Sequence, residues 1–200
     1  MPTPQSLLER YIEAKDLTRP QLMPEIYAPD AVLTFSIATD SISFPLRVAG
    51  IEGITKTLVV DFAARFSRCK TFYVCGSMPP TTVEVAILPW LVLMSEPAAS
   101  CLRVGKGYYR WTFQRKSADA LQVAAMHIHI DRMDAIDEVE PRLLEAAQSV
   151  LSYPWLAPAR LRSEFQALVE ADPAFAFLRD FRTPVDPAAS GKPFSQPTSM

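Results

Sequence analysis

The chain has 200 residues, which is enough for one domain with a sizeable core. Hydrophobic residues make up 49% and charged residues 21%, and the formal net charge is −2 with no long run of either sign. A nucleic-acid-binding protein would normally present a basic face, so this balance argues against that class. The most apolar stretch, residues 83–94, is too short to span a bilayer and contains Glu84 and Pro89, so we expect no membrane segment.

Three cysteines, Cys69, Cys75 and Cys101, occur without the spacing of a disulfide framework or of a zinc site. Reduced thiols in a cytoplasmic protein are the expected state. The N-terminus has no basic segment followed by an apolar run, so we expect no signal peptide. The sequence contains no P-loop, Rossmann glycine pattern, serine-hydrolase motif or zinc-protease motif, and we expect no cofactor.

Helical periodicity dominates the first third of the chain. Residues 6–16 predict a helix with Ser6 as its N-cap, and Tyr11 lies on the apolar face, so it should point inward. A shorter apolar stripe that includes Met23 and Tyr27 predicts a second helix after Pro20. Gly50 precedes a third, whose core-facing residues repeat at intervals of three and four: Ile51, Ile54, Leu58, Phe62 and Phe66.

Strands are expected between and after these helices. Residues 31–37 and 41–48 predict a hairpin, although Pro45 limits the second strand to an edge or a bulge. Residues 70–75, 81–95, 101–115 and 121–133 predict longer strands separated by turn residues. Long strands joined by short turns indicate an antiparallel meander.

Alternation along the last two strands assigns their side chains to faces. One face of the third long strand carries Arg103, Gly105, Gly107, Tyr109, Trp111 and Phe113. In the fourth, Met126, Ile128 and Ile130 share a face that we expect to point inward, with His127, His129 and Asp131 on the other. A slip of one residue in this register would reverse that assignment.

The composition changes after residue 136. Helical spacing returns in residues 139–151, 160–170 and 175–181, whereas the chain from residue 182 onward is rich in proline and small polar residues. We therefore expect three parts: an α+β domain over residues 1–136, a helical extension packed on it over 137–181, and a disordered tail over 182–200.

The order of the elements in residues 6–135 resembles that of the NTF2-like, SnoaL-like superfamily. Three features carry the resemblance: the first helix, the sequence Tyr27-Ala-Pro-Asp30-Ala entering the first strand, and the helix start Gly50-Ile-Glu-Gly-Ile54. The resemblance implies a cone in which a strongly curved antiparallel sheet wraps around the N-terminal helices, here with extra C-terminal helices. It also implies a homodimer formed through the convex face of the sheet.

The first sixty residues look most like the ketosteroid isomerase branch of that superfamily. That branch holds an enolate oxygen with a tyrosine and a protonated aspartate, and uses a carboxylate as base. By the resemblance, the tyrosine matches Tyr11, but the base position falls on Phe35 and the aspartate position on Tyr109. Steroid isomerisation by that mechanism is therefore not expected.

These departures predict an aromatic interior suited to a flat, apolar small molecule with one or two oxygens. The expected ligand-binding residues are Tyr11, Met23, Tyr27, Phe35, Phe62, Arg103, Tyr109, Trp111, Phe113, Met126 and Ile128. An equally open alternative is that the aromatic side chains simply fill the cone. Arg103 could bind a carboxylate at the cavity mouth or pair with a nearby acidic residue at the rim of the sheet.

Two other functions stay open from the sequence. One is a small isomerase, dehydratase or cyclase that uses Tyr11, Tyr109 and His127 or His129 in acid/base chemistry, which requires a base inside the cone. The other is a dimeric protein-interaction module whose cone is filled. His127, His129 and Asp131 could also hold a metal ion, but they match no recognisable metal pattern, and we expect none.

Overall fold

The computed structural model describes residues 2–117, 120–137 and 142–189. Its first helix, α1 (Pro4–Asp16), begins earlier than the sequence predicted, and Ser6 is not the N-cap. Thr3 caps the helix instead: its hydroxyl accepts from the Ser6 amide at 3.1 Å, while the Ser6 hydroxyl accepts from the Thr3 amide at 2.9 Å. Pro4 fits the first helical turn because that position needs no amide hydrogen.

The helices that follow are short. After η1 (Pro20–Leu22) and α2 (Met23–Ile26), the expected third helix consists of α3 (Ile51–Thr55), the π-helical turn η2 (Lys56–Val60) and α4 (Asp61–Arg65). Gly50 precedes this run with φ 78°, a left-handed conformation that favours glycine. The π turn rotates the helix so that both Leu58 and Val59 are buried.

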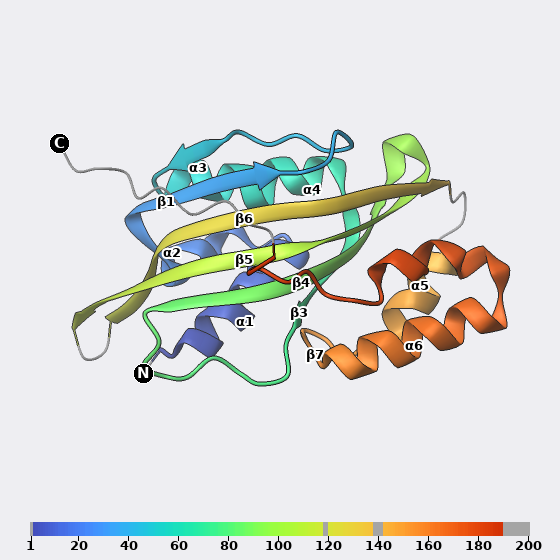
Figure 1. Ribbon diagram of the computed structural model, residues 1–200. Helices are drawn as coiled ribbons and strands as arrows, with labels where there is room; N and C mark the ends of the chain where they lie inside the picture. Colours follow the sequence, from blue (N-terminus) through green and yellow to red (C-terminus); the bar gives the residue numbers. More distant parts are fainter. Residues whose placement is uncertain (1, 118–119, 138–141, 190–200) are drawn as a thin grey trace.

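A seven-stranded curved sheet forms the body of the described chain (Figure 1). Its strands are β1 (Tyr27–Ile37), β2 (Arg47–Ala49), β3 (Ser67–Val74), β4 (Val85–Glu96), β5 (Cys101–Ser117), β6 (Ala120–Asp137) and β7 (Trp155–Leu156), in the order β2-β1-β6-β5-β4-β3-β7. The meander from β3 to β6 is antiparallel as expected, but the sheet is mixed, because β1 pairs with β6 in parallel and β3 with β7 in parallel.

The hairpin predicted over residues 31–48 also differs from the structure. The return strand was expected over residues 41–48, but only the short strand β2 forms there. Residues 38–46 form a loop without regular structure. Pro45 has no amide hydrogen for the ladder, which accounts for the late start of the strand. This loop carries Phe44, which matters for the site.

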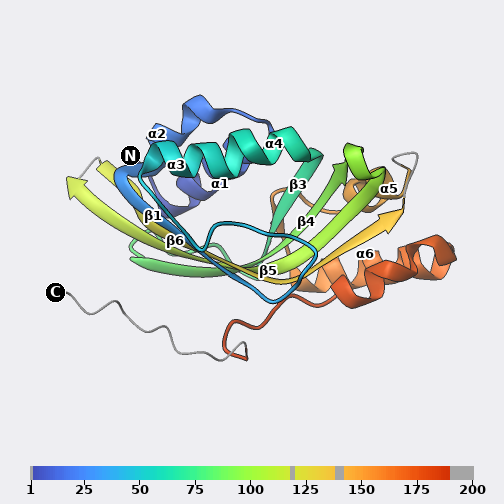
Figure 2. The same ribbon diagram turned by 90° about the horizontal axis from the view of Figure 1, so that it is seen from above.

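The sheet has a buried face on each side, and Figure 2 shows helices α1, α2, α3 and α4 on the concave side and α6 on the other. Along β4, the alternate residues Trp90 and Val92 belong to the core under α1, whereas Leu91 and Leu93 belong to a second core under the C-terminal helices. Because both faces are covered, β4 is a continuous apolar run rather than an alternating one.

The C-terminal extension consists of α5 (Arg142–Ser149), α6 (Pro158–Ala171) and the 3-10 helix η4 (Pro173–Phe181). Phe165, Leu178 and Phe181 are fully buried in the second core. Within the predicted tail, Val185 is buried, and residues 190–200 lie outside the described residues. No helix in the described part of the chain is long and apolar enough to cross a membrane.

Candidate functional site

The candidate site is a cavity between α1 and the concave face of the sheet. Tyr11 and Lys15 stand four residues apart on α1, so their side chains lie on the same face of the helix. Both side chains are buried, with exposed fractions of 0% and 5%. A tyrosine and a lysine are thus the polar groups that α1 brings to the interior of the cone.

The cavity has a volume of about 50 Å³ and an almost wholly apolar wall. Helices, the 38–46 loop and five strands contribute to that wall, which consists of Tyr11, Lys15, Phe35, Ile42, Phe44, Leu58, Phe62, Thr71, Trp90, Val92, Met94, Tyr109, Ile128, Ile130 and Met133. Aromatic rings occupy most of the cone around it: Tyr109 stacks on Trp90 with ring centroids 5.6 Å apart and meets Tyr11 edge-on at 6.0 Å.

Two hydrogen-bond donors on this wall have no partner. Among the described residues, the Tyr11 hydroxyl and the Trp90 indole nitrogen are buried without a hydrogen bond of normal geometry. The Tyr109 hydroxyl lies close enough to that of Tyr11 to help raise the pKa of Tyr11, but it does not satisfy it with good geometry. The Trp111 indole nitrogen is also unpaired, but Trp111 does not line the cavity. A buried polar group without a partner costs about 1–3 kcal/mol, so two of them on one small cavity require an explanation.

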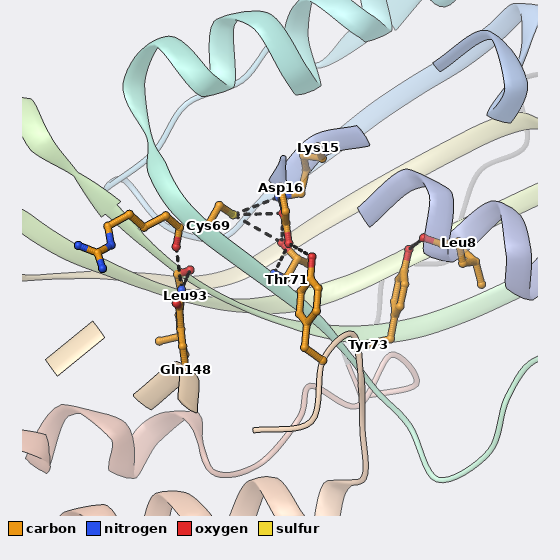
Figure 3. A network of polar contacts seen from close by, with 10 residues as sticks. Leu8, Lys15, Asp16, Cys69, Thr71, Tyr73, Leu93 and Gln148 are labelled. Carbon is orange, nitrogen blue, oxygen red and sulfur yellow. Dashed lines mark hydrogen bonds and ion pairs between the residues drawn. The ribbon is translucent and has the colours of Figure 1, made fainter. Parts of the chain in front are cut away.

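A buried polar network lies beside the cavity at the end of α1 (Figure 3). The Asp16 carboxylate forms an ion pair with Lys15 at 2.7 Å and accepts from the Thr71 amide at 2.6 Å. It also accepts from the Thr71 hydroxyl at 3.1 Å, from the Cys69 thiol at 3.3 Å and from the Tyr153 hydroxyl at 3.0 Å. Asp16 thus joins α1 to β3 and to the segment before β7.

The network fixes the protonation of its members. Burial alone would lower the pKa of Lys15, but the attraction of Asp16 outweighs burial and holds the pKa of this ammonium above its ordinary value. Burial, reinforced by Asp16, raises the pKa of the Cys69 thiol to about 12. Lys15 is therefore a cation and Cys69 a neutral thiol at neutral pH, so neither acts as a base or a nucleophile there.

The tyrosines of the cavity are proton donors for the same physical reason. Burial raises the pKa of Tyr11 and of Tyr109 well above the ordinary value of a phenol. No carboxylate and no imidazole lines the cavity among the described residues. The cavity can therefore donate hydrogen bonds, but it offers no base for the acid/base chemistry that the sequence left open.

The structure distributes the predicted ligand residues between the cavity and the surrounding core. Tyr11, Phe35, Phe62, Tyr109 and Ile128 line the cavity. Met23, Tyr27, Trp111, Phe113 and Met126 are buried in the same core without lining it. Arg103 lies away from the cavity wall, where its Nε donates to Glu96 at 2.6 Å.

His127 and His129 lie on the convex side, as the alternation along β6 indicated, while Met126, Ile128 and Ile130 are in the concave core. His127 is hydrogen-bonded through Nδ1 to Thr34 at 2.8 Å and through Nε2 to Ser36 at 2.9 Å, and His129 shares the Ser36 hydroxyl at 2.7 Å. The described residues contain no cluster of three or more His, Cys, Asp or Glu side chains that could hold a metal ion.

These histidines give the stability of the protein a pH dependence. Burial, then the charges of His129 and Arg110, lower the pKa of His127 to about 4, and burial lowers that of His129 against the opposing effect of Asp131. The unfolded chain takes up these protons below about pH 6.5. The native state binds them only at lower pH, because the pKa values of its histidines are lowered. The free energy of unfolding therefore has its full value above about pH 6.5 and falls as the pH drops toward 4.

We expect His127→Gln to reduce this pH dependence. Between pH 7 and pH 5, the free energy of unfolding of the wild type should fall by about 1 kcal/mol more than that of the variant, a figure discounted because His127 is partly exposed to solvent. Urea titrations of both proteins at the two pH values measure the difference. Parallel losses in the two proteins would show that His127 does not carry the effect.

Several wall residues were not predicted from the sequence: Lys15, Thr71, Phe44 and Trp90 stand out among them. One signal was available for Lys15, because it follows Tyr11 by one helical turn and must share its face. Trp90 gave no such signal, since residues on both sides of it in β4 are apolar.

Solved structures share the fold of this chain. The crystal structure of LinA gives a TM-score of 0.54 at 13% sequence identity, over 66% of this chain and 86% of LinA. A LinA-type3 hexachlorocyclohexane dehydrochlorinase from Novosphingobium barchaimii LL02 gives 0.51 at 13% identity, over 68% and 92% of the two chains. An NTF2-like superfamily protein from Salmonella enterica subsp. enterica serovar Typhimurium str. LT2 gives 0.50 at 12% identity, over 67% and 89%.

At such low identity the likeness establishes the fold alone: the chain has the NTF2-like α+β fold. No family model matches the sequence, and no curated protein matches it. The function must therefore be argued from the site.

Proposed function

We propose that this protein binds a small, flat, mostly apolar molecule in the cavity under α1, through one acceptor oxygen that receives hydrogen bonds from Tyr11 and Trp90. The apolar wall favours a ligand that is mostly apolar, and the two donors favour a ligand with a single hydrogen-bond acceptor. A homodimer formed through the uncovered part of the convex face, and a cytoplasmic location, are further parts of this proposal.

The two unpaired donors are the observation that supports it. Other tyrosines of the same core have partners: the Tyr73 hydroxyl donates to the Leu8 carbonyl at 3.1 Å, and the Tyr27 hydroxyl to the Met126 sulfur at 3.0 Å. Tyr11 is as deeply buried as these two, but among the described residues its hydroxyl has only the neighbouring Tyr109 hydroxyl and makes no hydrogen bond of normal geometry. A ligand oxygen would satisfy Tyr11 and would also account for the unpaired Trp90.

The enzymatic alternative has less support. Two of the similar solved structures are hexachlorocyclohexane dehydrochlorinases, so the fold is compatible with catalysis on a small apolar substrate. In this chain, however, the described wall of the cavity supplies no carboxylate or imidazole, and Lys15 is held protonated by Asp16. Binding needs no base, which makes it the simpler function for this site.

The interaction-module alternative requires a filled cone and an exposed apolar patch on the convex face. A cavity of about 50 Å³ remains in the cone, and on the convex side the C-terminal helices cover Phe72 and Val74 of β3 and Leu91 and Leu93 of β4. Val85 and Ile87, at the start of β4, stay exposed on that face. Leu46, the large apolar side chain with the highest exposure among the described residues, is in the loop before β2 rather than on that face. The cone is therefore not completely filled, and this favours ligand binding over protein docking.

Tyr11→Phe tests the proposal by removing one donor without changing the shape of the wall. In the absence of ligand, we expect the free energy of unfolding to stay the same or to rise, by up to about 1–3 kcal/mol, because an unsatisfied hydroxyl has been removed. With phenol as the probe, the wild type should gain more thermal stability than the variant does. Thermal and urea unfolding, with and without phenol, measure both effects.

Two matched controls sharpen the test. Tyr73→Phe removes a buried hydroxyl that has a partner, so we expect it to lower the free energy of unfolding by about 1 kcal/mol. Trp90→Phe should weaken phenol binding, whereas Trp111→Phe should not, although both indole nitrogens are unpaired. A loss of stability in Tyr11→Phe equal to that in Tyr73→Phe, with no effect of phenol on any variant, would indicate that bound water satisfies Tyr11 and would refute the proposal.

A further inference from the structure

The cavity is too small for the kind of molecule that its wall suits. An apolar cavity of about 150 Å³ is large enough to bind benzene. The cavity under α1 has about 50 Å³, a third of that size. A molecule with one aromatic ring therefore fits only if a side chain of the wall moves away.

Phe44 is the side chain best placed to move. Its ring stacks on Phe35, with centroids 4.8 Å apart and the planes within 1° of parallel, so it occupies a ring-sized space on the aromatic wall. Unlike Phe35, which is buried in β1, Phe44 is half-buried and belongs to the loop between β1 and β2. A ligand ring in the same place would make the same stacking contact.

The loop around Phe44 is attached to the sheet on both sides of this residue. The Ser41 hydroxyl donates to the Met133 carbonyl, and the Phe35 amide donates to the Leu46 carbonyl at 3.0 Å. No hydrogen bond of the described residues involves residues 42–45. Phe44 is thus held mainly by its apolar contacts, between two fixed points of the backbone.

A second pocket next to the cavity could accept the Phe44 ring when a ligand displaces it. It has a volume of about 230 Å³, lies between the loop and α4, and is lined by Ser43, Pro45, Asp61 and Arg65 among others. Phe44 and Phe62 line both this pocket and the inner cavity. The two spaces are therefore neighbours separated by phenylalanine side chains.

We propose that Phe44 is a built-in occupant of the ligand site, and that a ligand with one aromatic ring binds by displacing it and stacking on Phe35 in its place. This inference rests on the proposed function and adds the class of ligand and the residue that controls access. Displacement lowers the apparent affinity of the wild type, because only the fraction of molecules with Phe44 moved out can bind.

Phe44→Ala tests the inference by removing the occupant. With phenol and toluene as probes, we expect the variant to bind at least about tenfold more tightly than the wild type, since a minor open state is populated at roughly 10% or less. Leu46→Ala is the matched control: Leu46 is in the same loop but is 77% exposed and lines neither space, so its affinity should equal that of the wild type. Isothermal titration calorimetry measures all three proteins.

The outcomes separate this inference from the proposed function. If Phe44→Ala binds phenol no better than the wild type, while Tyr11→Phe still weakens binding, Phe44 is not the occupant but the site stands. If Phe44→Ala and the wild type both fail to bind phenol and toluene, the inference and the site fall together. If Phe44→Ala does not fold, Phe44→Leu replaces it, with a smaller gain in affinity expected and an unchanged affinity contradicting the inference.

Discussion

Replacing Asp16 with alanine should lower the free energy of unfolding by about 3–5 kcal/mol, because it leaves the buried Lys15 ammonium without its counter-ion. Neither side chain of this pair can reach water freely: their exposed fractions are 5% for Lys15 and 0% for Asp16. The loss also removes the acceptor for the Thr71 amide and for the Tyr153 hydroxyl. Urea denaturation of the purified variant measures the effect.

Two controls belong to this experiment. Asp61→Ala breaks an ion pair with Lys56 whose partners are 55% and 69% exposed, and it should cost less than about 1 kcal/mol. Lys15→Met should destabilise the wild type but stabilise the Asp16→Ala variant, because in the variant it removes an unpaired buried charge. A cost below 1 kcal/mol for Asp16→Ala, or the same sign for Lys15→Met in both backgrounds, would contradict this account of the network.

Gly107→Ala should destabilise the protein by about 3 kcal/mol or more and should lower the yield of soluble, folded protein. A Cβ atom at Gly107 would lie 1.9 Å from the His129 carbonyl oxygen and 2.7 Å from the Trp90 ring. The clash involves backbone, which cannot move aside as a flexible side chain can. The strands come this close at a β-bulge, where Lys106 pairs with Arg132 and Gly107 with Ile130.

Gly76→Ala is the matched control, since an added Cβ there meets no atom within 4 Å. We expect it to be neutral or slightly stabilising, because alanine restricts the unfolded chain more than glycine does. Soluble yield and urea midpoints of the two variants give the comparison. Equal stability of Gly107→Ala and Gly76→Ala would show that the close approach of β5 and β6 is not required by the fold.

Much of the fold could be predicted because local periodicity and burial agree. The stripe through Tyr11 fixed the inward face of α1, and alternation along β6 placed Ile128 inside and His127 outside. The parallel pairing of β1 with β6 was not predictable in this way. These strands are far apart in the sequence, and periodicity within each strand does not indicate which distant strand it pairs with.

The site was harder to predict than the fold, for three physical reasons. Phe44 is in a loop that has no periodicity, so nothing in the sequence assigns its ring to the interior. Trp90 is in a strand covered on both faces, where hydrophobicity does not distinguish one side from the other. Asp16 ends an amphipathic helix, where a charged residue normally indicates the solvent side, and only its partners on β3 explain its burial.

The measurement that tests the central claim most directly is a two-dimensional NMR titration of the tryptophan indole N–H signals with phenol. The three tryptophans differ in the structure: Trp90 is unpaired on the cavity wall, Trp111 is unpaired away from it, and the Trp155 indole donates to Glu9 at 2.7 Å. Spectra of Trp90→Phe and Trp111→Phe assign the signals.

We predict that phenol shifts the Trp90 indole signal the most, that the shift saturates, and that Tyr11→Phe weakens it while Phe44→Ala reaches saturation at lower phenol concentration. The Trp155 signal should not move. If no indole signal shows a saturable shift in the wild type or in Phe44→Ala, the cavity under α1 is not a ligand site.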